Sequence, residues 1–203
     1  MNVTRGADWG EPAPLPDDAV EVTGDAELAE LVGAAFRAGR PPPPVALLGG
    51  DLARTLGGRA DRRRFDTGRA ARFEVDIGVA LLDGRRRWFA AHLVAHRRWW
   101  RGRALVVANA AFRGTENLAP RAHPGDGRLD VLEADLPRGQ RRAARRRLRT
   151  GTHVPHPAIR QRRVTAATWH LDPGAIVTVD GVRWGPGTEL AVRIEPAAVA
   201  VWV

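Results

Sequence analysis

The hydrophobic pattern of this chain changes its period at about residue 72, and that change restricts the folds open to it. Upstream, short apolar runs alternate with stretches of helical spacing, which is typical of the strands and helices of an α/β layer. Downstream, apolar and polar residues alternate with a period of two, as expected for half-buried strands. We therefore expect a small α/β unit followed by a mostly antiparallel β unit.

The upstream unit is expected to contain two strands and two helices. A short strand is indicated around residue 21, and a helix begins near Asp25, whose side chain can cap free N–H groups. Four consecutive prolines at 41–44 prevent that helix from continuing. A buried strand over residues 45–48 then leads into a second helix, which ends at the glycine pair 57–58.

The downstream unit is expected to consist of strands joined by short turns. Asp83 and Gly84 predict a hairpin, because both residue types tolerate the positive φ that tight turns need. One helix is expected over residues 138–149. Strands are expected over residues 73–82, 87–96, 104–108, 129–134, 164–170, 176–179, 189–194 and 199–203. This pattern predicts a β-sandwich and not a parallel sheet.

The chain accordingly divides into three parts. Residues 1–16 are rich in proline and acid and are predicted to be a flexible tail. Residues 17–60 are predicted to form a short Rossmann-like α/β lobe, and residues 61–203 a β-sandwich lobe. The predicted fold class is therefore α/β plus all-β.

Arginine supplies every basic side chain in the Lys plus Arg count. That count is 32 against 23 Asp plus Glu, a formal net charge of +9, and no lysine or cysteine is present. A Walker-type phosphate loop, a Schiff-base lysine, a disulfide and a cysteine zinc site are all excluded. The uniform use of arginine indicates a coding preference, so the charge alone does not predict a nucleic-acid partner.

Four segments carry motifs that composition does not explain, at residues 45–57, 106–110, 118–131 and 177–181. Asp51-Leu-Ala-Arg-Thr-Leu-Gly57 opens the second predicted helix, and Asp126-Gly-Arg-Leu-Asp-Val131 follows an Ala119-Pro-Arg-Ala122 stretch. In this order they resemble the diacylglycerol kinase family, including its bacterial lipid kinases. The resemblance extends over about residues 17–203.

The resemblance implies a nucleotide-binding α/β lobe, here truncated, and a β-sandwich acceptor lobe with the active site between them. It implies ATP-dependent phosphorylation of a diacylglycerol-like lipid hydroxyl, with Mg²⁺ on the nucleotide and Asp180 as the general base. Asp126 matches a loop that binds a divalent ion in some members. The nucleotide side would be formed by Gly24, Asp25, Gly49, Gly50 and Asp51.

The nucleotide motif departs from the family pattern. Where the family has Gly-Gly-Asp-Gly-Thr, this chain has Thr23-Gly-Asp-Ala-Glu27, and a carboxylate at Glu27 would repel phosphates. The family's preceding strand and helix are missing, and Val182 stands where the family's base has a carboxylate partner. Two alternatives therefore stay open beside a lipid kinase. One is a non-catalytic pseudokinase that binds lipid or a partner kinase, and the other is a basic nucleic-acid-binding protein.

The arginine run over the predicted helix 138–149 indicates an anionic partner. Such a run is usually a solvated face, but each charge near an anionic bilayer contributes about 1 kcal/mol. With the lipid substrate that the resemblance implies, we expect contact with an anionic membrane surface. Trp99 and Trp100, which lie among arginines, could stack on the bases of a nucleic acid, but a nucleic-acid partner is less favoured. A homodimer or a partner kinase is expected from the family resemblance.

The expected location is cytoplasmic, with peripheral contact at the inner membrane face. No apolar run reaches the roughly 20 residues of a spanning helix, and the N-terminus lacks a secretory pattern. His92 and His96, four residues apart on a predicted strand, are not expected to share a metal.

Overall fold

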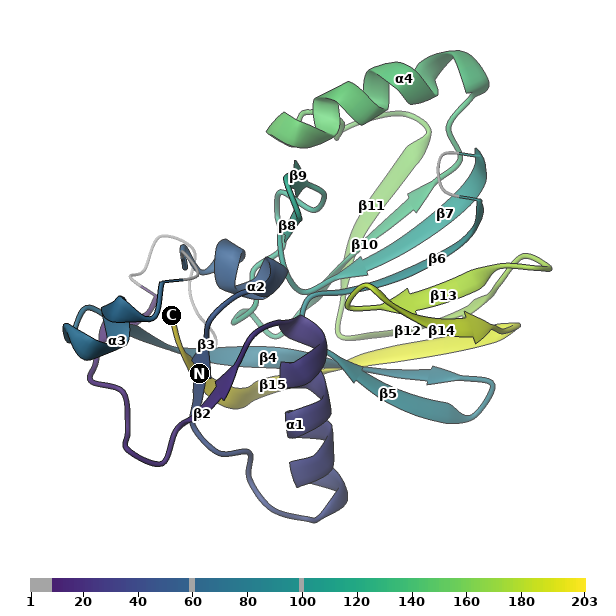
Figure 1. The fold of residues 1–203 in the computed structure, drawn as a ribbon. Helices are drawn as coiled ribbons and strands as arrows, with labels where there is room; N and C mark the ends of the chain where they lie inside the picture. The colour runs from purple at the N-terminus through teal and green to yellow at the C-terminus, as the bar shows by residue number, and fades with distance from the viewer. Residues whose placement is uncertain (1–8, 59–60, 99–100) are drawn as a thin grey trace.

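The computed structural model describes residues 9–58, 61–98 and 101–203 and has a layered architecture (Figure 1). From top to bottom in this view lie helix α4, a six-stranded sheet that we call sheet B, a seven-stranded sheet that we call sheet A, and helix α1. Sheet A also contains the parallel strands of the N-terminal unit, and helices α2 and α3 lie toward that end of the molecule. An α/β unit joined to a mostly antiparallel sandwich confirms the predicted fold class.

Sheet B forms one half of the sandwich, and its strands run in the order β11, β10, β7, β6, β13, β14. Each of these pairings is antiparallel. The bounds are β6 His92–Arg98, β7 Arg101–Ala108, β10 Leu129–Ala134, β11 Ile159–Val164, β13 Ile176–Val179 and β14 Val182–Pro186. A small hairpin precedes β10 and consists of β8 Phe112–Arg113 and β9 Glu116–Asn117.

Sheet A has the order β1, β4, β15, β3, β2, with β5 on β4 and β12 on β15. The bounds are β1 Glu11–Pro12, β2 Val20–Val22, β3 Val45–Leu47, β4 Ala71–Leu82, β5 Arg85–Phe89, β12 Ala166–His170 and β15 Glu189–Trp202. The helices are α1 Asp25–Arg37, α2 Gly50–Thr55, α3 Arg63–Asp66 and α4 Arg138–Arg147. Within the described ranges none of the helices is long and apolar enough to cross a membrane.

Two long strands, β4 and β15, hold the α/β unit and the sandwich together. The first part of β15 pairs with one end of β4, and its last residues pair with the other end, Trp202 opposite Arg72. Between these stretches β15 has a bulge, where Ala197 has a φ of 46°. Past the bulge, β15 also pairs in parallel with β3, Val201 opposite Val45. One sheet therefore runs through both units.

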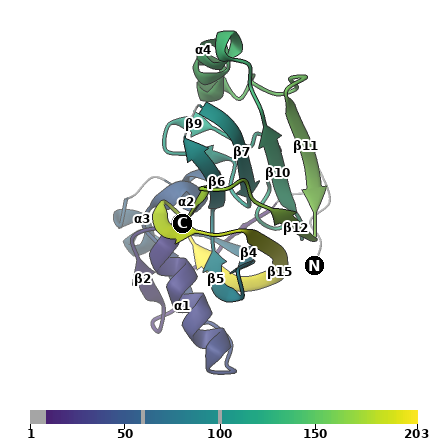
Figure 2. The same cartoon turned by 90° about the vertical axis from the view of Figure 1, so that its right-hand side faces the viewer.

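Three buried clusters fill the layers. Leu28 and Val32 of α1 pack on sheet A in the first cluster, because their spacing places both on one face of the helix. Phe89 and Leu129 belong to the second, which lies between the two sheets. The third lies between the outer face of sheet B and α4, where Leu148 is buried. Figure 2 shows α1 and α4 at opposite ends of the molecule.

The strand predicted over residues 87–96 is two strands. β5 ends at Phe89 in sheet A and β6 begins at His92 in sheet B, so the chain changes sheets at Ala90 and Ala91. Phe89 and Leu93 belong to the same buried cluster on either side of this crossover. Apolar alternation therefore continues across the break, and the sequence pattern contains no sign of it.

Other expectations need correction or lie outside the described ranges. The predicted tail over residues 1–16 is ordered in part, since β1 pairs with β4 and Trp9 packs on Phe73 with ring centroids 5.0 Å apart. The strand predicted over 164–170 is divided between β11 and β12, which belong to different sheets. The predicted lobe boundary at residue 60 and the Trp99–Trp100 pair fall outside the described residues.

Gly78 of β4 lies opposite Phe89, and a Cβ at Gly78 would come within 2.1 Å of the ring atom Cζ. We expect Gly78→Ala to lower the free energy of unfolding by about 1–3 kcal/mol, because the buried ring must move. Gly139→Ala in α4 is the control. A Cβ added at Gly139 would have no described atom within 4 Å, apart from its chain neighbours and the backbone of its own helix. It should be stabilising by up to about 1 kcal/mol. Urea unfolding measures both values, and a neutral Gly78→Ala would contradict this packing.

Candidate functional site

Four polar side chains from distant segments meet where the α/β unit joins the sandwich. Asp25 opens α1, Asp51 lies in α2, His92 opens β6, and Asp180 occupies the turn between β13 and β14. Asp25 accepts a hydrogen bond from the Asp51 N–H, and Asp51 Oδ2 lies 3.7 Å from His92 Nδ1. The His92 N–H in turn donates to Asp180 Oδ1 at 2.9 Å. We call these four residues the acidic cluster.

Asp180 caps the crossover between the sheets. Its carboxylate accepts hydrogen bonds from the N–H groups of Ala90 (2.8 Å), Ala91 (2.9 Å) and His92 (2.9 Å). These N–H groups need an acceptor because the chain leaves one sheet there before it enters the other. Asp180 has a φ of 46° and Gly181 a φ of 78°, as in a tight Asp-Gly hairpin turn. The turn therefore places the carboxylate at the crossover.

Burial raises the pKa of Asp180 to about 7. The three N–H donors oppose this rise, and the nearby Asp25 carboxylate adds to it. A carboxyl group that titrates near neutral pH can both accept and release a proton under physiological conditions. The arrangement therefore gives Asp180 two capacities, as a structural cap and as a proton acceptor.

Asp25 links the two helices of the α/β unit. Its carboxylate accepts hydrogen bonds from the N–H groups of Asp51 (2.7 Å) and Leu52 (3.0 Å) and so caps α2. Gly50 has a φ of +99°, and a Cβ there would lie 2.4 Å from Asp25 Oδ1. Gly49 precedes it in extended conformation as the N-cap of α2. Burial raises the pKa of Asp25 to about 6, with the two N–H donors opposing.

Asp51 and His92 complete the acidic cluster. Asp51 Oδ1 accepts a hydrogen bond from the Gly114 N–H at 2.6 Å, so it also ties α2 to the β8–β9 hairpin. His92 is buried, and its Nε2 lies 2.9 Å from the Ala110 carbonyl oxygen, which can only accept. Nε2 therefore carries the proton. Burial lowers the pKa of His92 to about 4, and Asp51 opposes this shift, so the ring is neutral at pH 7.

Asp76 and Asn109 support the same junction. The Asn109 side-chain amide donates to the carbonyl oxygens of Asp76 (2.7 Å) and Ala90 (2.8 Å). The Asp76 carboxylate accepts from the N–H groups of Gly127 (2.7 Å) and Ala197 (2.8 Å), and so caps the bulge in β15. Asn109 lies in a segment that the sequence analysis singled out, whereas Asp76 and His92 carried no motif signal that predicted their roles.

Asp126 lies apart from the acidic cluster. Its Oδ1 accepts a hydrogen bond from the Arg128 N–H at 3.0 Å, and its Oδ2 forms an ion pair with Arg163. Arg163 Nε also lies 3.5 Å from Oδ2 of the fully buried Asp130, its cross-strand partner. Burial raises the pKa of Asp130 to about 6. The Arg163 guanidinium thus lies against both carboxylates, and the divalent ion expected at Asp126 stays a prediction.

Among the described residues no group of three or more His, Cys, Asp or Glu side chains has the arrangement of a metal site. The residues predicted for the nucleotide side and for the base do come together, since Asp25, Asp51 and Asp180 belong to one cluster. Their roles toward ATP, Mg²⁺ and the acceptor stay predictions.

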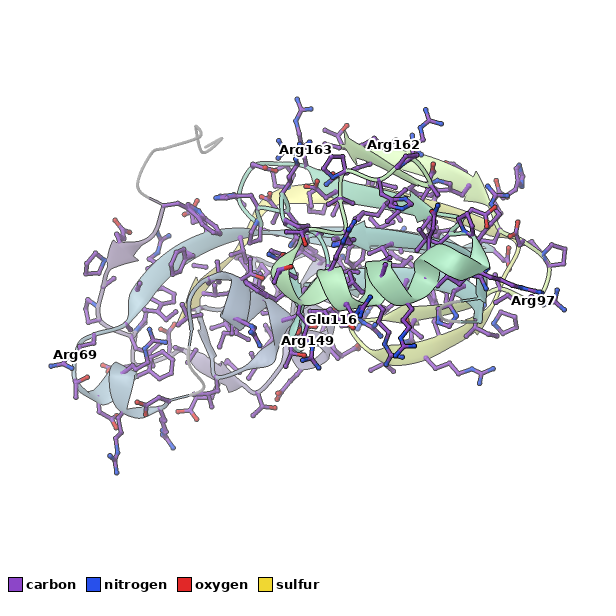
Figure 3. All side chains as sticks on the ribbon, turned by 90° about the horizontal axis from the view of Figure 1, so that it is seen from above. Arg69, Arg97, Glu116, Arg149, Arg162 and Arg163 are labelled. Atoms are coloured by element: carbon purple, nitrogen blue, oxygen red, sulfur yellow. The ribbon has the colours of Figure 1, made fainter. Side chains whose placement is uncertain are left out.

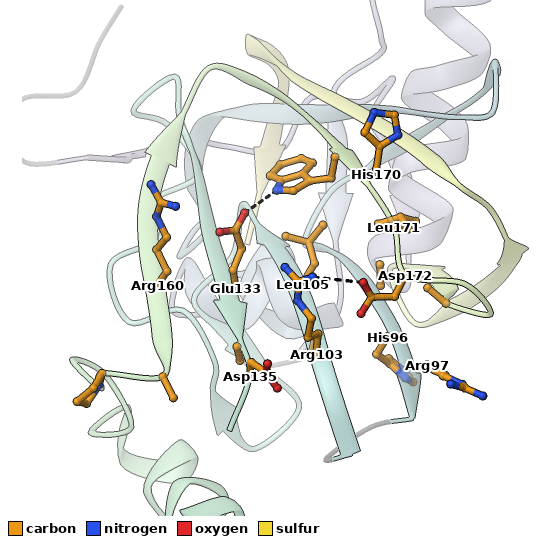
Figure 4. Close-up of a pocket in the computed structure, with 17 residues that line it drawn as sticks. His96, Arg97, Arg103, Leu105, Glu133, Asp135, Arg160, His170, Leu171 and Asp172 are labelled. Carbon is orange, nitrogen blue, oxygen red and sulfur yellow. Dashed lines mark hydrogen bonds and ion pairs between the residues drawn. The ribbon is translucent and has the colours of Figure 1, made fainter. Parts of the chain in front are cut away.

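One cavity borders the acidic cluster, and others lie along sheet B. One of about 280 Å³ borders Asp180 and is lined by α1, β5 and the β13–β14 turn. A second, of about 70 Å³, is largely apolar and lies between sheet B and α4. A third, of about 310 Å³, opens between the sheet ends (Figure 4). In its wall Arg103 pairs with Asp172 (3.3 Å) and Trp169 Nε1 donates to Glu133 (2.6 Å).

The two-unit fold is of the type found in NAD kinases and diacylglycerol kinases. The sequence model described as "YegS C-terminal NAD kinase beta sandwich-like domain" matches residues 54–203. The chain therefore belongs to that family. A search among curated proteins finds none that matches.

Solved structures from Bacillus anthracis str. Sterne share the fold. A protein provisionally assigned as a diacylglycerol kinase superposes with a TM-score of 0.71 at 14% identity, over 91% of this chain and 77% of that chain. A second structure with the same assignment superposes with a TM-score of 0.69 at 14% identity and the same coverage. A third, described as a diacylglycerol kinase, has a TM-score of 0.57 at 14% identity, over 79% and 66% of the two chains. At this identity the likeness concerns the fold.

Asp180→Ala leaves three N–H groups of the crossover without an acceptor. Because a buried unsatisfied N–H costs about 1–3 kcal/mol, we expect the free energy of unfolding to fall by about 3 kcal/mol or more. The folded-state pKa lies above the ordinary 3.8, so the carboxyl's contribution to stability is lost as pH rises from about 4 to about 7. The wild type's advantage over the variant should therefore shrink across that window.

Denaturant unfolding at several pH values measures this difference. Val182→Ala is the control, since Val182 lies in the same hairpin and is 48% exposed. It should change the free energy of unfolding by less than about 0.5 kcal/mol. An advantage of the wild type that grows with pH would contradict the raised pKa.

Arg163→Ala removes the cation that serves Asp126 and Asp130. We expect the free energy of unfolding to fall by about 1–3 kcal/mol, because the buried Asp130 loses its counter-charge. Millimolar Ca²⁺ or Mg²⁺ should raise the melting temperature of the variant and leave that of the wild type unchanged. Arg162→Ala, on the neighbouring residue that pairs with Glu133, should show no such dependence. A wild-type melting temperature that falls with a chelator would instead reveal a bound ion.

Proposed function

We propose that this chain is a lipid kinase that transfers a phosphoryl group from ATP to a lipid hydroxyl, with Asp180 as the general base. The observation that carries the proposal is the acidic cluster. It brings a carboxyl group with a pKa of about 7 next to the N-terminal turns of α1 and α2, beside a cavity. The family and the shared fold support a phosphotransferase of this type.

Bound ATP with Mg²⁺ would supply the phosphoryl group. The start of α1 leaves room for it, because Gly24 is extended and a Cβ there would meet no described atom within 4 Å. Leu28 is the first residue of α1 whose N–H bonds back to a carbonyl, that of Gly24 at 3.1 Å, so the earlier N–H groups face outward. Asp180 would accept the proton of the attacking hydroxyl.

An anionic membrane is the expected site of the lipid. Of the ten residues of α4, all described, Ala144 alone is buried, and arginines cover the exposed side. The exposed arginines of α4 and of the turn after it are Arg138, Arg142, Arg145, Arg146, Arg147 and Arg149. None of them has an acidic partner among the described residues, so their charge is available to lipid head groups. The apolar cavity beneath α4 would accommodate the end of an alkyl chain.

A non-catalytic lipid-binding protein is the second candidate, and a specific observation favours it. Asp25, Asp51 and Asp180 all accept backbone N–H groups, and Glu27 accepts the N–H (2.7 Å) and hydroxyl (2.9 Å) of Thr23. Asp25 and Glu27 both lie in the first turn of α1 and already complement its positive end. A nucleotide's phosphates would therefore meet carboxylates at that end.

Phosphate transfer from labelled ATP to diacylglycerol, in vesicles with anionic lipid and Mg²⁺, tests the first candidate. We expect transfer by the wild type and a loss of at least about 100-fold in Asp180→Asn, since a general base contributes that much. Unfolding midpoints of both proteins must be compared, because Asp180 is also a cap. No transfer by a folded wild type, together with vesicle binding, would support the second candidate.

Vesicle binding is measured in the same preparations. Arg142→Glu with Arg146→Glu reverses two charges on α4 and should abolish binding to anionic vesicles. Arg63→Glu with Arg69→Glu is the control for charge, because both side chains are exposed at the far end of the α/β unit, where Figure 3 shows Arg69. Equal binding by the two double variants would exclude α4 as the membrane contact.

A further inference from the structure

The cavity beside Asp180 is formed by three elements. Its volume is about 280 Å³, and α1 contributes small side chains, Ala26 and Ala29, to its wall. The β13–β14 turn contributes Asp180 and its neighbours, and β5 contributes Arg86, Arg87 and Trp88. Because β5 pairs only with β4 among the described strands, its other edge faces this space.

The arginines around this cavity are held by aromatic rings. The Arg37 guanidinium lies 5.2 Å from the ring centroid of Trp88, and that of Arg86 lies 5.8 Å from it. Arg87 lies 5.5 Å from the ring centroid of Trp184 on β14. Stacking of this kind restrains a long side chain and leaves its N–H donors free. The donors of this cavity are therefore partly ordered before any ligand arrives.

Trp88 is itself fixed by its contact with α1. It is 8% exposed, and a Cβ at Gly33 would lie 2.6 Å from its Cε3 atom. The indole thus packs directly on the helix backbone, and the two arginines that stack on it are anchored to the core. Both arginines are exposed to solvent, but unlike the arginines of α4 they stack on a buried aromatic ring.

The charges of the cavity favour an anion. Arg37 pairs with Glu30 at 3.0 Å, whereas Arg86 and Arg87 have no acidic partner within the described part of the chain. The remaining carboxyl in the cavity wall is Asp180, whose burial favours the neutral form up to about pH 7.

We propose that this cavity binds the phosphate group of a phosphate ester, through the guanidinium groups of Arg86 and Arg87. A guanidinium can donate two parallel N–H bonds to phosphate oxygens. Arg86 and Arg87 both line this cavity, the first against Trp88 and the second against Trp184. The phosphate could belong to a lipid head group or to a nucleotide. Phosphate binding by this cavity does not depend on the function proposed above. Only a role of the cavity in catalysis would rest on that function.

The test is an NMR titration of the full ¹⁵N-labelled chain with inorganic phosphate. The indole N–H signal of Trp88, identified with Trp88→Phe, reports on this cavity because Arg86 stacks on that ring. We expect a saturable shift at millimolar phosphate. Arg86→Ala with Arg87→Ala should weaken binding by at least about tenfold, and the corresponding double Lys variant should retain part of it.

Arg142→Ala with Arg146→Ala removes the same charge from α4 and should leave the affinity at Trp88 unchanged. ATP with Mg²⁺ and a soluble short-chain phosphatidic acid are then compared as competitors, and the stronger one identifies the source of the phosphate. No shift of Trp88, or equal weakening by the two double Ala variants, would overturn the proposal. Phosphate binding without kinase activity would keep it and would count against the proposed function alone.

Discussion

The structure depends on how the chain satisfies its backbone N–H groups where it passes from one sheet to the other. At Ala90 and Ala91 the chain belongs to neither sheet, and the Asp180 carboxylate accepts the N–H groups exposed there. The residue expected to act as a base is thus also the residue that caps the crossover between the sheets. If Asp180 is the base that we propose, one carboxyl group couples chemistry to stability.

Elements with a strong local signal could be predicted from the sequence. The helix from Asp25 has one apolar face and a proline run after it, and the helix rich in arginine has no competing pattern. The break between β5 and β6 was not predictable, because Phe89 before it and Leu93 after it belong to the same buried cluster. The two-residue strand at Glu11 was missed for a different reason, since proline-rich segments are usually irregular.

The candidate site was predictable only where a motif supplied the residues. Asp25, Asp51 and Asp180 stood in motifs, and the fold brings them together. His92 joins them through a crossover that no local pattern marks, and Asp76 caps a bulge more than a hundred residues away in sequence. Arg163 was equally hidden, because its pairing with Asp126 depends on the register of β10 and β11. Long-range register is set by packing, which a local pattern does not contain.

The shared strands have a mechanical consequence. Because β4 and β15 continue without a flexible linker from the sandwich into the α/β unit, the two units cannot rotate against each other as separate bodies on a hinge. The bulge at Ala197 bends the sheet but is pinned by Asp76. We therefore expect any movement that admits a ligand to come from elements at the periphery, such as α4 or the edge of β5. The sheet that β4 and β15 share should stay rigid.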